Sequence, residues 1–487
     1  MNGSRGLTYW ASALAIGVLA AAVPAEAASE NDSSADATEV TRPAFRPLRF
    51  TEDWSAYGDI LRDQRRWPDQ VKYLPLSDDE SVRLSIGGSA RARLEHWRNF
   101  NFGDPPDARN NDTFVLGRAF LHADLQAGEH LRVFGELKSA GVTDRRLIGG
   151  RRAIDVDTFD VQNLFVDVST PIGSDDGTLT FRAGRQELLF GGQRLVSPLD
   201  WANTRRTFEG FSAILDVGDW SVHGFYTQPV EVRKYDWNRR DSDSQFFGVF
   251  GTGQLEPLNA TLDMYWLGLH RQGPVTFNET TGRERRQTVG TRLAGEIGDT
   301  AFDYDVEGAY QFGKVGNDSI SAYMFASRTG YTFSEVWSTP RVFAGFDYAS
   351  GDRSPGGRVQ TFNQLFPLGH AYLGWIDAVG RQNIIAASTG VTFDPVDRLT
   401  VDVHGHMFWR AETTDALYNV GGAVSRAGDA GSSREVGAEL DLLLRYQLDR
   451  HNTVSFGYSH FFPGRFIRES GPSDSMQFLY TGWEYRF

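Results

Sequence analysis

The 487-residue sequence contains no cysteine, very few lysines and no long apolar run after about residue 25. The lack of cysteine excludes a disulfide framework, a thiolate nucleophile and cysteine-ligated metal sites. The lack of later apolar runs excludes a helical membrane protein. The 63 acidic residues outnumber the 49 basic ones, a net charge of −14. This excess argues against nucleic acid as a partner, because proteins that bind duplexes carry a basic face.

The basic residues are almost all arginine, since the sequence has lysine only at positions 72, 138, 234 and 314. A guanidinium group binds a carboxylate through two parallel hydrogen bonds, which an ammonium group cannot do. A GC-rich genome is the simpler explanation of this bias, and selection for anion binding is the alternative.

The first 27 residues have the pattern of a secretory signal peptide. Arg5 precedes an apolar stretch from Leu7 to Val23, and Ala25 and Ala27 provide the small residues of a cleavage site. A retained membrane anchor is the less favoured alternative, because the apolar run is short. Residues 28–80 are predicted to form a periplasmic N-terminal segment that is partly disordered.

From Val82 onward, apolar and polar residues alternate over unusually long stretches. Between Val82 and Trp97, the positions of one parity are apolar or small and those of the other are mostly polar or charged. A strand of a soluble protein needs five or six residues, whereas a tilted strand that crosses a bilayer needs about ten. The pattern predicts strands with one face toward lipid and the other toward an aqueous lumen.

The same unit recurs through residues 81–487 and predicts an all-β fold, a transmembrane antiparallel β-barrel of about 18 strands. Short turns (126–129, 217–219, 297–299 and 449–452) alternate with long loops (97–112, 139–156, 188–204, 228–243 and 412–433), as in outer-membrane barrels. The strands are predicted to begin near residues 82, 113, 130, 157, 178, 206, 220, 244, 260, 286, 301, 319, 339, 380, 398, 434, 453 and 474.

The end of the sequence supports an outer-membrane location in a Gram-negative bacterium. Leu479, Thr481, Trp483, Tyr485 and Phe487 share one parity, and this pattern is similar to the signal by which outer-membrane barrels are recognised for assembly. Barrels of sixteen to eighteen strands enclose an aqueous channel. The sequence therefore predicts a channel rather than an enzyme.

Several motifs resemble those of the alginate export family. They occur in order between residue 46 and Phe487, and comprise Arg46–Phe50, Lys72–Leu76, Gly184–Leu188, Gln193–Ser197, Arg205–Gly210 and Thr361–Pro367. The resemblance implies an eighteen-stranded alginate export domain with an arginine-rich lumen, through which an anionic, uronate-type polysaccharide leaves the cell. It also implies long loops that restrict the pore. Residues 198–203 depart from the charged link that the family has in this loop.

Strand parity, together with an inward fold of the loop after Gly184, predicts the residues that line the pore and bind the substrate. The same residues could instead form ion pairs that stiffen the wall, and the loop could lie on the surface. The apolar Thr361–Tyr372 stretch is expected to fold inward. The predicted pore-lining residues are Arg91, Arg93, Glu95, Arg118, Asp124, Arg132, Glu136, Lys138, Arg182, Arg185, Arg205, Arg206, Arg292, Asp402, His404, Arg410, Glu439, Asp441 and Arg445.

The expected partners are an anionic polysaccharide or a small anionic solute, outer-membrane lipid and periplasmic proteins of an export complex. Arginine clusters at 145–152 and 283–286 could collect the polymer, although binding of lipopolysaccharide phosphates is favoured. No cofactor, metal or catalytic residue is predicted, because His404 and His406 are a weak metal pair and Ser459 and His460 point to opposite faces. A general or anion-selective porin for uptake of small solutes is the alternative function.

Overall fold

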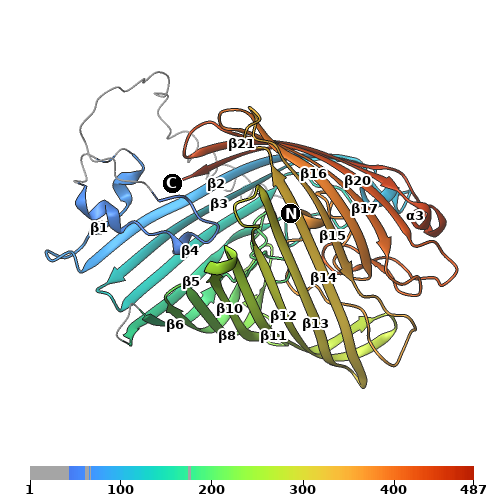
Figure 1. Cartoon of the computed structure of the whole chain (residues 1–487), viewed down its shortest axis with the longest axis horizontal. Coiled ribbons are helices and arrows are strands. Elements are labelled where there is room, and N and C mark those ends of the chain that lie inside the picture. The colour runs from blue at the N-terminus through green and yellow to red at the C-terminus, as the bar shows by residue number, and fades with distance from the viewer. Residues whose placement is uncertain (1–42, 61–64, 66, 174–176) are drawn as a thin grey trace, which may run out of the picture.

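In a computed structural model, the part of the chain that is described comprises residues 43–60, 65, 67–173 and 177–487. The predicted signal peptide lies outside these residues. Within them, eighteen long strands form a closed antiparallel barrel (Figure 1). They are β2 (Val82–Arg98), β3 (Asp112–Ala127), β4 (Leu131–Val142), β5 (Asp157–Ile172), β6 (Gly177–Gln186), β7 (Phe208–Val217), β8 (Trp220–Glu231), β10 (Ser244–Leu255), β11 (Ala260–Phe277), β12 (Thr280–Glu296), β13 (Phe302–Val315), β14 (Asp318–Thr332), β15 (Arg341–Ala349), β16 (Ile384–Val396), β17 (Leu399–Arg410), β20 (Glu435–Gln447), β21 (Asn452–Pro463) and β22 (Met476–Arg486).

The barrel closes where the last strand pairs with the first. β22 runs antiparallel to β2, with Trp97 opposite Phe478 and Ser89 opposite Arg486. Closure is required because lipid offers no hydrogen-bond partners to an open strand edge. The predicted barrel of 18 strands is confirmed, and the predicted starts match to within two residues except at β12 and β16. β12 begins earlier because β11 and β12 extend as a hairpin around a two-residue turn.

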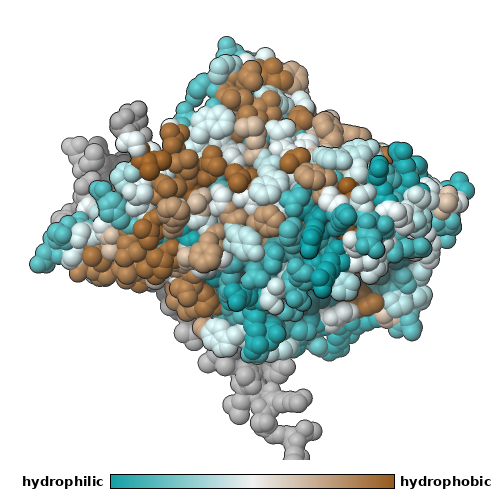
Figure 2. All heavy atoms as spheres, turned by 90° about the horizontal axis from the view of Figure 1, so that it is seen from below, coloured by the Kyte–Doolittle hydropathy of each residue, from teal (hydrophilic) through white to brown (hydrophobic). Residues whose placement is uncertain are grey.

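The alternation along each strand separates a lipid-facing surface from the lumen. On β3, the side chains of Val115 and Leu121 are 38% and 51% exposed, whereas those of Arg118 and His122 on the other parity are buried. Figure 2 shows apolar residues gathered toward one end of the face in view and polar residues toward the end that carries the long loops. No helix in the described part of the chain is long and apolar enough to span a membrane.

The two ends of the barrel differ: one end has short turns, and the other carries the long loops together with the two-residue turns that join β11 to β12 and β13 to β14. Residues 43–81 lie at the short-turn end beside the C-terminus, whereas α3 (Arg465–Ser470) and the long loops lie at the opposite end (Figure 1). Residues 43–81, here called the N-terminal segment, contain 3₁₀ turns and the short strand β1 (Leu74–Pro75), which pairs with β2. Phe50 packs against Phe134 and Phe165 of the lumen wall, with ring centroids 5.7 and 5.1 Å apart. The apolar side chain of Phe50 is therefore buried by packing against the barrel wall.

Two long loops fold into the lumen and fill much of it. One joins β6 to β7 (residues 187–207), and the other joins β15 to β16 (residues 350–383) and contains α2 (His370–Leu373). A bridge between Val196 and Phe366 connects the two loops. Apolar residues of both loops, such as Phe362, are buried together with the aromatic residues of the wall. The expected inward fold of the Thr361–Tyr372 stretch is explained by this burial, because its apolar side chains leave water.

The buried Lys72 makes attachment of the N-terminal segment dependent on pH. Its ammonium group lies 4.6 Å from the ring centroid of Trp54 and has no hydrogen-bond partner in the described residues. Burial, with a smaller contribution from Arg49, lowers the pKa of Lys72 to about 7. A detached segment would regain the ordinary pKa near 10.5. Between these values only the detached state binds the proton, so attachment becomes stronger as the pH rises.

We therefore predict that the N-terminal segment detaches less readily as the pH rises from about 7 toward 10. A spin label on Ala56→Cys would report this, because Ala56 is exposed and the sequence has no native cysteine. The mobile fraction of the label should fall over this range, and Lys72→Met should abolish the change. An equal response in the Lys72→Met protein would contradict the prediction.

Candidate functional site

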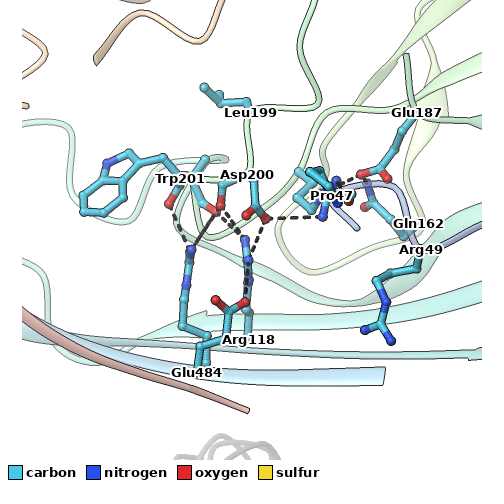
Figure 3. A network of polar contacts seen from close by, with 12 residues as sticks. Pro47, Arg49, Arg118, Gln162, Glu187, Leu199, Asp200, Trp201 and Glu484 are labelled. Carbon is cyan, nitrogen blue, oxygen red and sulfur yellow. Dashed lines mark hydrogen bonds and ion pairs between the residues drawn. The ribbon is translucent and has the colours of Figure 1, made fainter. Parts of the chain in front are cut away.

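Three arginines of the wall reach across the lumen and hold the 187–207 loop through its backbone. Arg91 donates hydrogen bonds to the carbonyls of Asp200 and Trp201, both at 3.0 Å. Arg93 donates to the carbonyl of Trp201 at 2.8 Å, and Arg118 donates to that of Asp200 at 2.7 Å. Hydrogen bonds from charged donors are stronger than neutral ones. These guanidinium groups, predicted to line the pore, therefore fix the position of the loop. Figure 3 shows Arg118 beside Asp200 and Trp201.

The Asp200 carboxylate lies between two guanidinium groups, 2.7 Å from Arg118 and 3.3 Å from Arg205. Burial acts to raise the pKa of Asp200, but these two cations outweigh it and hold the pKa well below its ordinary value. Arg205 also pairs with Glu187 at 2.6 Å and donates to the carbonyl of Pro47 at 2.8 Å. The N-terminal segment thus meets the inward loop inside the lumen, as Figure 3 shows at Pro47.

Residues 198–203 also anchor this loop to the barrel wall through the side chains of Asn203 and Asp200. The side-chain amide of Asn203 donates to the carbonyls of Gly117, Gly141 and Asp155, at 3.0, 3.0 and 2.9 Å. Asp200 supplies the carboxylate that the wall arginines bind.

A second group of ion pairs attaches the same loop to the opposite wall. Arg194 lies 3.0 Å from Asp305 and 3.1 Å from Glu307. Arg292, one of the predicted pore-lining residues, lies 2.9 Å from both Asp263 and Asp305. The 187–207 loop is therefore held from both sides of the lumen.

Other predicted residues form ion pairs along the wall itself. Arg132 pairs with Asp124, Arg182 with Asp167 and Lys138 with Asp157, each at 2.7 Å. Glu136 accepts a hydrogen bond from Asn163 at 2.8 Å, and Arg93 pairs with Glu95 at 2.7 Å. Pairs of this kind compensate buried charge, so these cations are already neutralised by carboxylates.

Of the residues predicted on β17 and β20, Glu439 contacts the other inward loop, whereas Arg445 lies beside the short turn that joins β16 to β17. Glu439 accepts a hydrogen bond from the backbone amide of Ile376 at 2.8 Å, and Asp441 lies 3.4 Å from His406. Asp402 lies 3.9 Å from His404 and 3.5 Å from Arg445. No group of three or more His, Asp or Glu side chains in the described residues could hold a metal ion.

Arg410 and Arg206 stabilise loops by donating to backbone carbonyls. Arg410 is fully buried and donates to the carbonyls of Thr413 and Asp415 at 2.9 and 3.1 Å. Arg206 donates to the carbonyls of Ser197 and Phe366 at 2.8 and 2.7 Å, which ties the two inward loops together.

The structure places Arg185 outside the lumen, which corrects its prediction as a pore-lining residue. β6 continues past Arg185, so this residue keeps the parity of the lipid-facing side chains. It pairs with Glu209 and Asp160 at 2.7 and 2.5 Å, beside Leu164 and Phe211, which are 53% and 68% exposed. Its position beside the inward loop favours the lumen in the sequence, but the strand extends to Gln186.

Two arginines in the predicted outer clusters are also unavailable to lipopolysaccharide. Arg145 is buried and donates to backbone carbonyls of its own loop. Arg286 is fully buried and pairs with Glu284 at 2.6 Å. Arg146 remains exposed at the long-loop end.

Sequence reasoning missed a group of guanidinium groups around Tyr372, on the 350–383 loop. Arg194, Arg381 and Arg328 lie 4.4, 5.2 and 5.5 Å from the centroid of this ring. Arg381 pairs with Asp347 at 2.6 Å, whereas Arg328 has neither a hydrogen bond nor an ion pair among the described residues. Strand parity on β14 could have identified Arg328, because the exposed Phe325 lies on the other parity.

Comparison with solved structures identifies the fold as that of an outer-membrane porin. The chain is similar to OccK2 (OpdF) of Pseudomonas aeruginosa in complex with glucuronate, with a TM-score of 0.53 and 12% identity over 82% of this chain and 98% of that one. It is also similar to a BenF-like porin from Pseudomonas fluorescens, with a TM-score of 0.55 and 9% identity over 83% and 99% of the two chains. A third similar structure is Pseudomonas aeruginosa OpdK with vanillate, with a TM-score of 0.53 and 10% identity over 82% and 98%.

The match of the sequence to a family model identifies the family, whereas the solved structures identify only the fold. The alginate export family model matches residues 82–480, so the chain belongs to the alginate export family. No curated protein matches the sequence. Family and fold together define an outer-membrane channel.

We predict that replacing Arg118 and Arg91 together by alanine releases the 187–207 loop. Each hydrogen bond from a charged donor contributes about 1.5–3 kcal/mol, so the open time of single channels should rise about tenfold or more. Planar-bilayer recording would measure this. Arg445→Ala is the control, because Arg445 is exposed and pairs only with Asp402 in the described residues. Unchanged open times in the double variant would contradict the proposed attachment.

Proposed function

We propose that this channel exports an anionic, uronate-type polysaccharide, and that the inward loops close it until the polymer engages. Membership of the alginate export family supports the substrate class. The observation that carries the proposal is the row of guanidinium groups at the loops, including Arg328, which has no carboxylate partner in the described residues. We propose no catalytic role for the chain.

A uronate polymer carries one carboxylate on each sugar. The polymer must keep moving through the channel, so no carboxylate can be held tightly. Conduction requires several weak sites rather than one strong site. Guanidinium groups that already share a carboxylate or a carbonyl would bind each unit weakly, whereas Arg328 would supply an uncompensated charge. In this proposal, polymer carboxylates compete with loop carbonyls for Arg91 and Arg118, which would release the loop.

Uptake of small anionic solutes is a second candidate function. The N-terminal segment and both inward loops restrict the lumen in the closed arrangement, which suits small molecules better than a polymer. The solved porins with glucuronate and vanillate have the same fold.

We further propose that the exposed Arg146 binds lipopolysaccharide and that the short-turn end faces periplasmic export proteins.

We predict that polyuronate oligomers block single-channel current and that neutral oligomers of equal length do not. Arg328→Gln should shorten each block about tenfold, because the loss of one charged hydrogen bond costs about 1.5–3 kcal/mol. Arg398→Gln is the control, since Arg398 lies in a short turn outside the lumen. If small uronates block the current and polymers do not, the uptake porin is favoured. If neither small uronates nor polymers block the current, the proposal is contradicted.

A further inference from the structure

A cavity of about 350 Å³ lies among the loops at the long-loop end of the lumen. Its walls come from β2, β22, both inward loops and the loops that join β2 to β3, β4 to β5 and β17 to β20. Cavities of about 300–1,000 Å³ that combine apolar walls with a few polar groups are typical ligand sites. This cavity has that composition.

Aromatic side chains form the apolar part of the cavity. Trp201 and Trp375 meet edge to face, with ring centroids 4.9 Å apart, and Arg93 lies 3.8 Å from the centroid of Trp201. Trp97 stacks on Phe478 at 4.2 Å on the barrel wall. Both Trp201 and Trp375 are only partly buried, so ring surface remains for a ligand. The faces of such rings carry negative charge density and attract the weakly positive C–H face of a pyranose.

Two polar groups that line the cavity lack the partners that their chemistry requires. Arg206 donates to the two loop carbonyls through a single guanidinium nitrogen and has no carboxylate partner in the described residues. Burial lowers the pKa of Arg206 to about 10. Asp377 has a buried oxygen, Oδ1, without a hydrogen-bond partner in the described residues, and His370 Nδ1 is 3.7 Å away. Unpaired buried polar groups are costly, which points to a ligand that pairs with both.

We infer that this cavity binds one pyranuronate unit, with its carboxylate on Arg206, a hydroxyl donating to Asp377 and its ring face on Trp375. The inference rests on the proposed function, because it places a uronate subsite at the long-loop mouth of the same lumen. A neutral sugar would leave Arg206 without an anion. An aromatic acid would supply no hydroxyl to Asp377. Only a ring with both groups satisfies the cavity.

Isothermal titration calorimetry of the full chain in detergent would test this site with sodium glucuronate, glucose and benzoate. Glucuronate should bind at least about tenfold more tightly than glucose or benzoate, as expected for one charged hydrogen bond. Arg206→Gln should reduce glucuronate affinity to that of glucose, and Trp375→Leu should weaken both sugars. Trp337→Leu is the matched control, since Trp337 is 79% exposed at the short-turn end.

Equal binding of glucuronate and glucose, or unchanged affinity in Arg206→Gln and Trp375→Leu, would overturn the inference. Gel mobility before and after boiling would show that each variant is a folded barrel. Polymer block of the current is measured separately. Block without glucuronate binding would refute the subsite and leave the conduit intact, whereas binding without polymer block would support the subsite and refute the conduit.

Discussion

The arrangement of the lumen depends on three guanidinium groups bonded to consecutive carbonyls of one loop. Arg91, Arg93 and Arg118 project from two adjacent strands and hold the backbone at Asp200 and Trp201. Lysine could not replace them, because a planar fork with several donors is needed to bind neighbouring carbonyls together. From this attachment follow the bridge to the second inward loop and the contact with the N-terminal segment. Arginines that strand parity predicts to bind substrate therefore hold the inward loop in place.

In the proposed mechanism, the closed state is held by contacts that a polyanion can replace. Charge-assisted hydrogen bonds are strong in a site that excludes water, but a carboxylate is a better partner for guanidinium than a carbonyl oxygen. A ligand that binds the open state more tightly shifts the equilibrium by its difference in affinity. A polymer that offers many carboxylates would provide this difference, with the cavity around Trp375 and Arg206 as its subsite at the long-loop end.

The barrel could be predicted from the sequence because lipid and lumen impose opposite polarity on neighbouring residues. Val115 and Arg118 show the rule, and the strand boundaries followed from it. The contacts of the site could not be predicted in this way. Arg91 binds a loop 109 residues away, and nothing local indicates that partner. Arg185 was predicted in the lumen because it lies beside a loop expected to fold inward, whereas its strand parity faces lipid. Arg328 was overlooked although strand parity indicated it.

In the proposed mechanism, the two inward loops must separate for a polymer to pass. They arise from different walls and meet at Val196 and Phe366, so a Val196→Cys, Phe366→Cys protein would link them across the lumen. The sequence has no other cysteine to interfere. Passage of a fluorescent uronate oligomer through reconstituted protein should stop on oxidation, return on reduction and be unaffected in either single variant. Equal passage in the oxidised and reduced states would show that the loops do not need to separate.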